Sequence, residues 1–286
     1  MGGNVLSPAS WALNADGSVN TPLLTDFAYR SVHDMTVAAE QIVAEYYAKS
    51  ASYAYWNGCS TGGRQGLMEA QRFPTDYNGI LADAPAINWA EFIPAELWPQ
   101  VVMNEQKDYP TACEFNAFDQ AAVAACDKSD PANGGVIDNP MTCGFDPRSL
   151  IGKTIVCNGA TLKITAADAE VVRQIWQGPT TRDGRRLWYG LTKGAPFGGL
   201  AGTTTTASGA GAGVPFPISA TWISYFLEQD PSFDTSTITY GNGPAPTDPL
   251  SALTSWVEQG RAPNALPAST VTAGGTVLTR DLHPFK

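Results

Sequence analysis

A glycine-rich turn between a short aromatic run and a helical segment constrains this chain more than any other feature. Residues 52–56 read Ser-Tyr-Ala-Tyr-Trp, a composition that suits a buried strand, and the sharp turn Asn57–Gly63 follows it. Residues 64–72 then favour a helix, and residues 79–82 favour another strand. Because a helix is also predicted over 26–48, the order helix, strand, turn, helix, strand predicts a parallel α/β sheet.

The other elements are predicted from apolar periodicity and from start and stop signals. Apolar side chains recur at every third or fourth position of 26–48, and Asp26 or Thr25 is expected to cap this helix. Residues 199–217 are rich in small and polar side chains, which predicts a surface loop. Further helices are predicted over 91–126, 166–177 and 249–259, the last capped by Asp248, and two strand candidates lie near 269–279.

Composition excludes several classes of protein. The chain has 286 residues, 43% of them hydrophobic, so it can bury a sizeable core. Its net charge of −10 argues against nucleic acid and against an anionic membrane surface as partners. No apolar run reaches the roughly 18 residues of a membrane-spanning helix, and the polar start at Met1–Asn4 does not predict a signal peptide. Composition does not indicate an oligomeric state.

Five cysteines give an odd count, and four of them lie between residues 113 and 157. Their spacing includes no Cys-x-x-Cys motif, which disfavours a zinc ribbon. Two local disulfides are therefore predicted, which implies an oxidising compartment and a secreted protein, and Cys59 is left as the odd thiol. Four cysteines allow three pairings, and the spacing alone leaves them open.

The turn Gly58-Cys59-Ser60-Thr61-Gly62 has the pattern of a nucleophile elbow, in which a serine stands in a strained turn between strand and helix. Both flanking positions, Gly58 and Gly62, are expected to require glycine, because a Cβ there would prevent the strand and the helix from packing closely. Ser60 would then be a nucleophile, and the amide of Thr61 would donate to an oxyanion. The alternative is a glycine-rich turn that only connects a strand to a helix.

A serine nucleophile needs a base, and the chain contains two histidines. His33 precedes Ser60 on a helix and is predicted to be a helix-surface or core-edge residue. His283 comes last, as the order serine, acid, histidine requires, but no strand-end loop is recognisable before it. We expect neither histidine to reach Ser60. The acidic candidates after Ser60 are Asp230, predicted in a turn, Asp234, and the cap Asp248.

These residues resemble the tannase/feruloyl esterase family of secreted serine esterases. The resemblance covers most of the chain and is closest over Ser10–Trp89, above all in Trp56–Gly66 and in Ala84–Trp89. The adjacent Cys59 and Ser60 inside the elbow are a specific signal of this family. The resemblance implies that Ser60 is the catalytic nucleophile, that Thr61 is the oxyanion amide, and that the substrates are esters of hydroxycinnamic or gallic acids, free or in the plant cell wall.

The resemblance also implies an α/β-hydrolase fold with an inserted lid domain. Residues 1–90 would form the first part of the hydrolase domain, 91–225 the lid, and 226–286 the last part, with an incomplete sheet. In the family, a cysteine directly after the catalytic histidine pairs with a cysteine like Cys59. Neither that His-Cys pair nor the family's Asp loop has a counterpart beside Gly241. Two alternatives follow: an active ester hydrolase, or an inactive truncated remnant or binding module that lacks the His and Asp of the triad.

The segment Cys126–Ile137 resembles the calcium loop of the family. Carried over, Asp127 and Asp130 would supply carboxylates, and Ala132 and Val136 would supply backbone carbonyls, as calcium prefers oxygen ligands. A glycine replaces the third aspartate of the family's loop, so a weak or empty structural calcium site is expected, the alternative being a solvated acidic turn. By resemblance, the disulfides are expected to join Cys113 to Cys126 and Cys143 to Cys157.

Four large aromatic residues allow two interpretations. They could line a pocket for an aromatic acyl group, because flat rings stack well on one another, or they could belong to the lid core. They are Trp176, Trp188, Tyr189 and Trp222.

Overall fold

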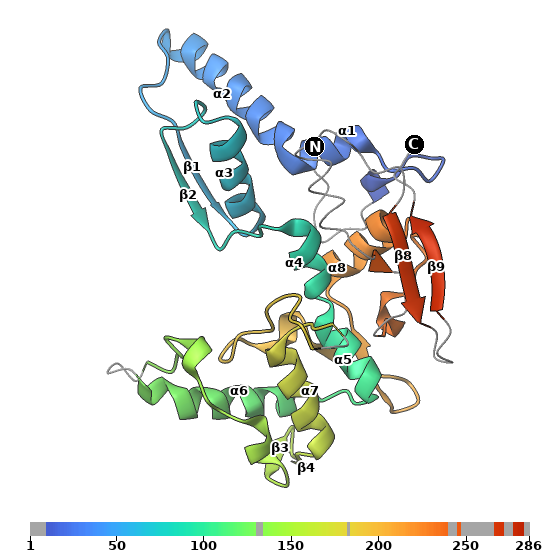
Figure 1. The fold of residues 1–286 in the computed structure, drawn as a ribbon. Coiled ribbons are helices and arrows are strands. Elements are labelled where there is room, and N and C mark those ends of the chain that lie inside the picture. The colour runs from blue at the N-terminus through green and yellow to red at the C-terminus, as the bar shows by residue number, and fades with distance from the viewer. Residues whose placement is uncertain are drawn as a thin grey trace. The chain divides into compact units, whose positions relative to one another are not determined.

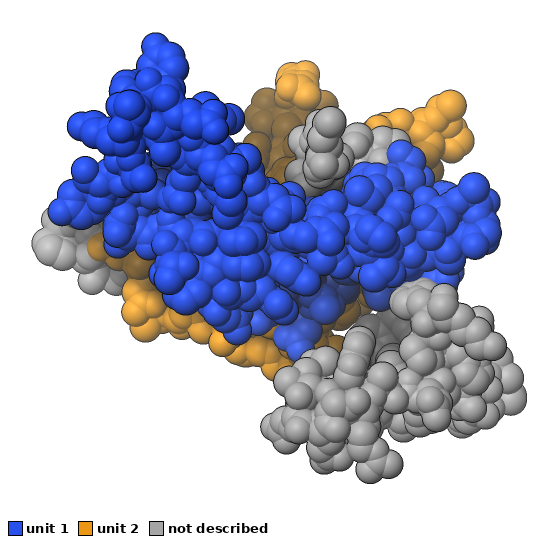
Figure 2. Space-filling view, turned by 90° about the horizontal axis from the view of Figure 1, so that it is seen from above, with its two compact units in different colours: residues 1–96, 216–233 blue, residues 97–215, 234–286 orange. Residues whose placement is uncertain are grey.

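The computed structural model describes residues 10–129, 134–181, 184–239, 245–246, 266–271 and 277–282. It divides into two compact units (Figure 2). Unit 1 comprises Met1–Glu96 and Phe216–Phe233, and unit 2 comprises Leu97–Pro215 and Asp234–Lys286. The cuts therefore fall at 96 and 215, whereas the predicted lid runs from 91 to 225. The later part of unit 1 belongs with the earlier part because α8 (Pro217–Trp222) packs against α4 (Trp89–Ala95).

Unit 1 begins with one long helical stretch. The 3₁₀ turn Ser10–Ala12 precedes α1 (Thr21–Thr25), the π-helical segment Asp26–Arg30 and α2 (Ser31–Tyr47). The prediction of a helix over 26–48 is confirmed, but its start is earlier. The expected caps, Thr25 and Asp26, lie inside the helical stretch, and the Asn20 side chain caps it by accepting a hydrogen bond from the Leu23 amide.

The strand–turn–helix–strand order is confirmed in unit 1. β1 (Tyr55–Cys59), α3 (Thr61–Arg72) and β2 (Gly79–Asp83) follow one another, and the two strands pair in parallel with Cys59 opposite Asp83 (Figure 1). β1 lies later than the predicted strand and continues through Gly58 and Cys59. Among the described residues this is the one parallel pairing, so only part of a hydrolase-like sheet is described.

The rest of unit 1 is built on aromatic side chains. After α4 in the first segment, α8 and the π-helical segment Ile223–Leu227 form the second segment of the unit. Trp222 joins the two, because its ring meets Trp89 at 5.7 Å and Phe226 at 4.3 Å between centroids. Trp11 packs on the same Phe226 ring at 5.7 Å.

Unit 2 is organised around three helices, α5 (Trp98–Gln106), α6 (Ala112–Cys126) and α7 (Ala166–Gln177). The predicted helical region 91–126 is thus three separate helices with α4, and the helix over 166–177 is confirmed. Thr111 and Thr165 start α6 and α7 with capping boxes. The helices enclose a core whose buried side chains include Val102, Met103, Phe115, Phe118, Val171, Val172, Ile175 and Phe197.

Two disulfides are present in unit 2, as predicted, but their pairing is not the expected one. Cys113 pairs with Cys157, and Cys126 pairs with Cys143. The pairs Cys113–Cys126 and Cys143–Cys157 were wrong because Cys113 and Cys126 lie near opposite ends of α6. At 1.5 Å per residue their Cα atoms are about 20 Å apart, far beyond the span of a disulfide.

The remaining strands pair in antiparallel fashion. β3 (Thr154–Cys157) pairs with β4 (Ala160–Lys163), and β8 (Leu266–Val271) pairs with both β7 (Ala245–Pro246) and β9 (Val277–Leu282). The last pair corresponds to the strand candidates near 269–279. The helix predicted over 249–259 and its cap Asp248 lie outside the described residues. Short 3₁₀ turns cover Asp127–Ser129, Pro140–Thr142, Pro147–Leu150, Phe197–Gly199 and Thr235–Thr237.

The predicted surface loop 199–217 was wrong for its central part, which is the hairpin β5 (Gly202–Thr205) and β6 (Gly211–Val214). The fully buried Gln100 on α5 holds this hairpin in place. Its amide nitrogen donates to the carbonyls of Gly202 at 3.2 Å and Val214 at 3.1 Å. Within the described part of the chain, no helix is both long enough and apolar enough to cross a membrane.

Candidate active site

Ser60 occupies the turn between β1 and α3 with φ 59° and ψ −117°, a conformation that non-glycine residues rarely adopt. Backbone hydrogen bonds hold it there. The Ser60 amide donates to the Asp83 carbonyl at 3.1 Å, and the Ser60 carbonyl accepts from the amides of Arg64 and Ala86, each at 3.1 Å. The predicted position of Ser60 at a strained strand-to-helix elbow is confirmed.

The elbow depends on close approach of backbone atoms at two glycines. A Cβ on Gly58 would lie 2.6 Å from the Gly62 carbonyl group, and a Cβ on Gly63 would lie 2.4 Å from the Asp83 oxygen. Gly62, in contrast, has no atom within 4 Å of its Cβ position. The expectation that Gly58 must lack a Cβ agrees with these distances, but the second required glycine is Gly63, because it faces the end of β2.

A buried arginine fixes α3 against the first helical stretch. The Arg64 guanidinium donates to the carbonyls of Ala28 and Phe27, both at 3.0 Å, and lies over the rings of Phe27 and Trp89. Burial lowers the pKa of Arg64, because the charged form loses water. The family resemblance includes Arg64, but the sequence gave no sign that this charged side chain would be buried inside unit 1.

The groups around the turn suit a reacting carbonyl. Ser60 is exposed and Thr61 is half-buried. Thr61 is the first residue of α3, so its amide has no acceptor within the helix, and the helix N-terminus favours negative charge. Cys59 is a free, exposed thiol, as expected for the odd cysteine. Among the described residues, no side chain forms a hydrogen bond with the Ser60 hydroxyl.

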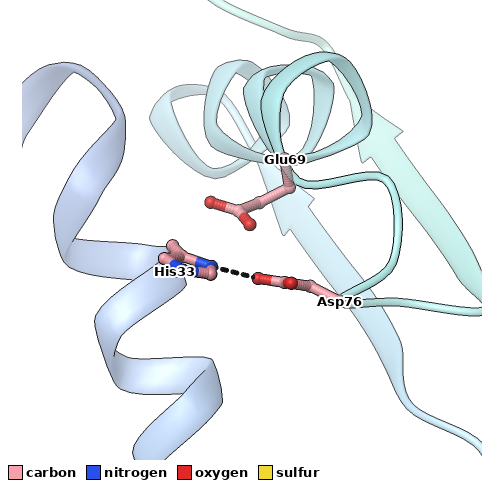
Figure 3. Close-up of side chains that lie close together, drawn as sticks. All are labelled: His33, Glu69 and Asp76. Carbon is pink, nitrogen blue, oxygen red and sulfur yellow. Dashed lines mark hydrogen bonds and ion pairs between the residues drawn. The ribbon is translucent and has the colours of Figure 1, made fainter.

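His33 lies at the other end of α3 from Ser60. Its Nδ1 is 2.6 Å from Asp76 Oδ2, and its ring stacks on Phe73 with 3.8 Å between centroids (Figure 3). Phe73 and Asp76 follow the C-terminal end of α3, and the 12 residues of that helix span about 18 Å. The prediction that His33 is a helix-surface or core-edge residue is confirmed. The hydrogen bond with Asp76 raises the pKa of His33.

Glu69 is a buried carboxyl that the sequence did not reveal. It is 1% exposed and lies on the inner face of α3 beside His33 and Asp76. Burial, followed by the charge of Asp76, raises the pKa of Glu69 to about 7. The available signal was its position: it lies three residues after Gly66 and six after Gly63, which both face inward.

The acidic candidates for a catalytic acid are occupied locally or lie outside the described residues. Asp230 Oδ1 accepts from the Ser232 amide at 2.8 Å, and Asp234 Oδ1 accepts from the Ser236 amide at 2.9 Å. The bonds with the serine side chain and amide lower the pKa of Asp230. The predicted turn at Asp230 is therefore confirmed. Asp248 and His283 lie outside the described residues.

The expected calcium loop follows α6 in unit 2. Asp127 Oδ2 accepts a hydrogen bond from the Gly135 amide at 3.1 Å, while Asp127 Oδ1 is buried and has no hydrogen-bond partner among the described residues. That free oxygen fits a cation ligand. Val136 is exposed, and Asp130 and Ala132 lie outside the described residues.

The aromatic residues considered for an acyl pocket do not belong to one unit. Trp176 packs beside Phe145 and Phe197 in the core of unit 2, whereas Trp222 lies in the aromatic cluster of unit 1. Trp176 is thus a core residue, as the second interpretation predicts.

Known proteins match this chain over most of its length. A family model described as "Tannase and feruloyl esterase" matches residues 7–240. A probable feruloyl esterase of Arthroderma benhamiae is 46% identical over 83% of this chain, and feruloyl esterase B of Aspergillus niger is 32% identical over 82%. The chain spans less than half of these curated relatives, 44% and 43% of their lengths.

Solved structures share the fold. The tannin acyl hydrolase from Aspergillus niger matches 98% of this chain and 70% of its own with a TM-score of 0.74 at 20% identity. Feruloyl esterase B from Aspergillus oryzae matches 95% of this chain and 73% of its own with a TM-score of 0.61, also at 20% identity. At this identity the likeness concerns the fold alone.

Proposed function

Because this chain belongs to the tannase and feruloyl esterase family, we propose that it is a serine carboxylic ester hydrolase with Ser60 as its nucleophile. The observation that carries the proposal is the conformation of Ser60, which is strained, exposed and held between β1 and α3 by backbone hydrogen bonds. A turn that served only as a connection would gain nothing from such strain, since a glycine at the same position would relieve it.

The proposed reaction follows from the groups at the elbow. The Ser60 oxygen attacks the ester carbonyl and gives its proton to a base, and the carbonyl oxygen becomes an oxyanion that accepts from the Thr61 amide. Collapse of this tetrahedral species breaks the ester bond, the alcohol leaves with the proton, and an acyl-enzyme remains. Water then adds to the acyl group, with its proton passing to the base, and the acid is released as Ser60 regains a proton.

The proposed substrates are esters of hydroxycinnamic or gallic acids, including esters in the plant cell wall. The printed names of the relatives, feruloyl esterases and a tannin acyl hydrolase, support this class. We also propose that residues 91–225, most of which lie in unit 2, form the lid of the hydrolase. The two disulfides of unit 2 support secretion, since such bonds persist in oxidising compartments.

The identity of the base decides between activity and the inactive alternative. His33 is bound to Asp76 at the far end of α3, and His283 is the second of the two histidines of the chain. Family membership favours the hydrolase and gives no support to an inactive binding module.

The test is hydrolysis of methyl ferulate and methyl gallate by the full chain, with fluorophosphonate labelling mapped by mass spectrometry. Turnover and labelling at Ser60, both lost in Ser60→Ala by roughly 10³-fold or more, would support the hydrolase. His33→Ala should leave the labelling rate unchanged, whereas His283→Ala should abolish it if His283 is the base. Turnover that survives Ser60→Ala would exclude Ser60 as the nucleophile, and a chain with neither turnover nor label would be the inactive alternative.

We further propose that the loop after α6 binds calcium weakly. The buried, unpartnered Oδ1 of Asp127 supports a cation ligand there, and Gly134 in place of a carboxylate supports low affinity. Titration calorimetry should detect weak calcium binding that Asp127→Asn removes. Tight binding, or weak binding that persists in Asp127→Asn, would contradict this proposal.

A further inference from the structure

Three potential metal ligands from three different segments meet inside unit 1. His33 comes from α2, Glu69 from α3, and Asp76 from the turn between α3 and β2 (Figure 3). One ligand atom of each lies within 4.8 Å of the corresponding atoms of the other two. We propose that His33, Glu69 and Asp76 form a binding site for a divalent transition-metal ion, with zinc as the ion to test.

Glu69 is the buried carboxyl of this cluster that a cation would neutralise. The residue is 1% exposed, and neither of its carboxylate oxygens has a hydrogen-bond partner in the described part of the chain. The ion pairs found among the described residues include none with Glu69, so no lysine or arginine neutralises it. Burying a carboxylate with no partner is costly, and Figure 3 shows its side chain directed towards His33 and Asp76.

The donor set selects the class of ion. One imidazole nitrogen and two carboxylates suit zinc and its neighbours among the divalent transition metals, whereas calcium requires six to eight oxygens. Two carboxylates and a neutral imidazole also balance the charge of a divalent ion. Three protein ligands leave at least one coordination position for water.

The surroundings hold the three ligands in place. The Phe73 ring lies parallel to the His33 ring, with an interplanar angle of 6°, and thus fixes its plane. The Asp76 amide donates to the Phe73 carbonyl at 3.0 Å, which fixes the turn that carries the carboxylate. The side chains of His33 and Asp76 are 30% and 10% exposed, so an ion can enter from solvent on that side.

The competing interpretation is a proton-linked cluster without metal. His33 Nδ1 lies 2.6 Å from Asp76 Oδ2, so a metal ion has to replace the proton between them. Both interpretations use the same residues, and only the ion distinguishes them. The experiment therefore measures the ion directly.

The first experiment is titration of the metal-free full chain with zinc by calorimetry. We expect one zinc ion per chain at this site and a loss of affinity of roughly 10–100-fold or more in Glu69→Gln, which keeps the side-chain shape but removes a charged ligand. Glu40→Gln is the matched control, because Glu40 is an exposed glutamate on α2 and its loss changes the net charge equally. Equal affinities in the two variants would overturn the proposal.

The second experiment uses the wild-type chain and does not depend on a variant that folds. Cobalt in place of zinc should give a spectrum without a thiolate charge-transfer band, because the ligands are nitrogen and oxygen. Zinc should also protect His33 from diethyl pyrocarbonate, with His283, the other histidine, as the internal control. A thiolate band would assign the metal to Cys59, and unprotected His33 at saturating zinc would leave the proton-linked cluster as the answer.

Discussion

The two units bury different kinds of groups. In unit 2, apolar side chains of α5, α6 and α7 close around a core that two disulfides reinforce. In unit 1, the buried positions of α3 are Gly63, Arg64, Gly66 and Glu69, so the contacts of this helix are backbone approach and polar groups. Unit 2 is thus stabilised by burial of apolar side chains, whereas the elbow of unit 1 depends on close backbone contacts at its glycines.

Exposure follows the same division. α2 buries only Val32 and Thr36, and apolar side chains such as Ile42 at 66% and Tyr46 at 80% exposure lie open on it. In unit 2, Phe118 and Val172 are completely buried. The candidate catalytic turn thus lies in the unit whose described residues bury fewer apolar side chains, so perturbations of the two units should differ in kind as well as in size.

The largest effect is expected from a cavity in unit 2. Phe118→Ala should lower the free energy of unfolding of this unit by about 3–5 kcal/mol, because it empties a fully buried ring site. Met35→Ala in unit 1, at a side chain 54% exposed, should cost less than about 0.5 kcal/mol. Hydrogen exchange of the α6 and α7 amides measures the loss of unfolding free energy in Phe118→Ala. A loss below about 1 kcal/mol for Phe118→Ala would show that this core is loosely packed.

The two disulfides of unit 2 should contribute unequally to its stability. Loop-closure entropy predicts a loss of about 4 kcal/mol without the Cys113–Cys157 bond, which closes 44 residues, and about 3 kcal/mol without Cys126–Cys143, which closes 17. Paired serine variants in chemical denaturation provide the measurement. The reverse order of effects would mean that native-state contacts, rather than loop length, set the contribution of each bond.

The elbow of unit 1 can be tested with two neighbouring glycines. Gly58→Ala should cost about 1–3 kcal/mol and reduce fluorophosphonate labelling of Ser60, because the new Cβ meets backbone 2.6 Å away. Gly62→Ala should be neutral or slightly stabilising, since its Cβ position is open and alanine favours a helix. If both variants labelled like the wild type, close approach at the elbow would not matter to Ser60.

A pH dependence of the stability of unit 2 is also expected. Burial, followed by the charge of Asp168 and then of Glu114, raises the pKa of Asp108 to about 6. Folding therefore favours the protonated form of Asp108. The stabilisation that this gives the folded state is fully present below about pH 4 and is lost as the pH rises through about 6. In Asp108→Asn, the free energy of unfolding, measured by chemical denaturation, should vary less with pH between about pH 4 and 7 than in the wild type. An unchanged slope would assign the dependence to another group.

Local sequence was sufficient for the elbow but not for contacts between distant segments. Ser60 was placed correctly because glycines beside a strand and a helix specify the turn locally. The pairing of Cys113 with Cys157 depends on the bounds of α6. Proximity in sequence favoured Cys113 with Cys126, but the helix separates these two cysteines along its axis. The hairpin over 202–214 was missed because its small and polar residues are typical of a loop. The contact that holds it comes from the buried Gln100, which is distant in the sequence.

The candidate metal cluster could not be predicted for a related reason. His33, Glu69 and Asp76 have no motif spacing, and 43 residues separate the first from the last. What joins them is the docking of α2 beside α3. The Arg64 guanidinium on α3 helps to fix this docking by donating to the carbonyls of Phe27 and Ala28 just before α2. A polar residue on the inner face of a glycine-rich helix is the signal to look for in such chains.

The position of the two cysteines on α6 also constrains oxidative folding. In an unstructured chain, Cys113 and Cys126 are close neighbours, and their bond would form readily. Once α6 is helical, that isomer is sterically excluded, so any chain trapped with it must exchange the bond before the helix can complete. The helix thereby excludes one of the three disulfide isomers that these four cysteines allow.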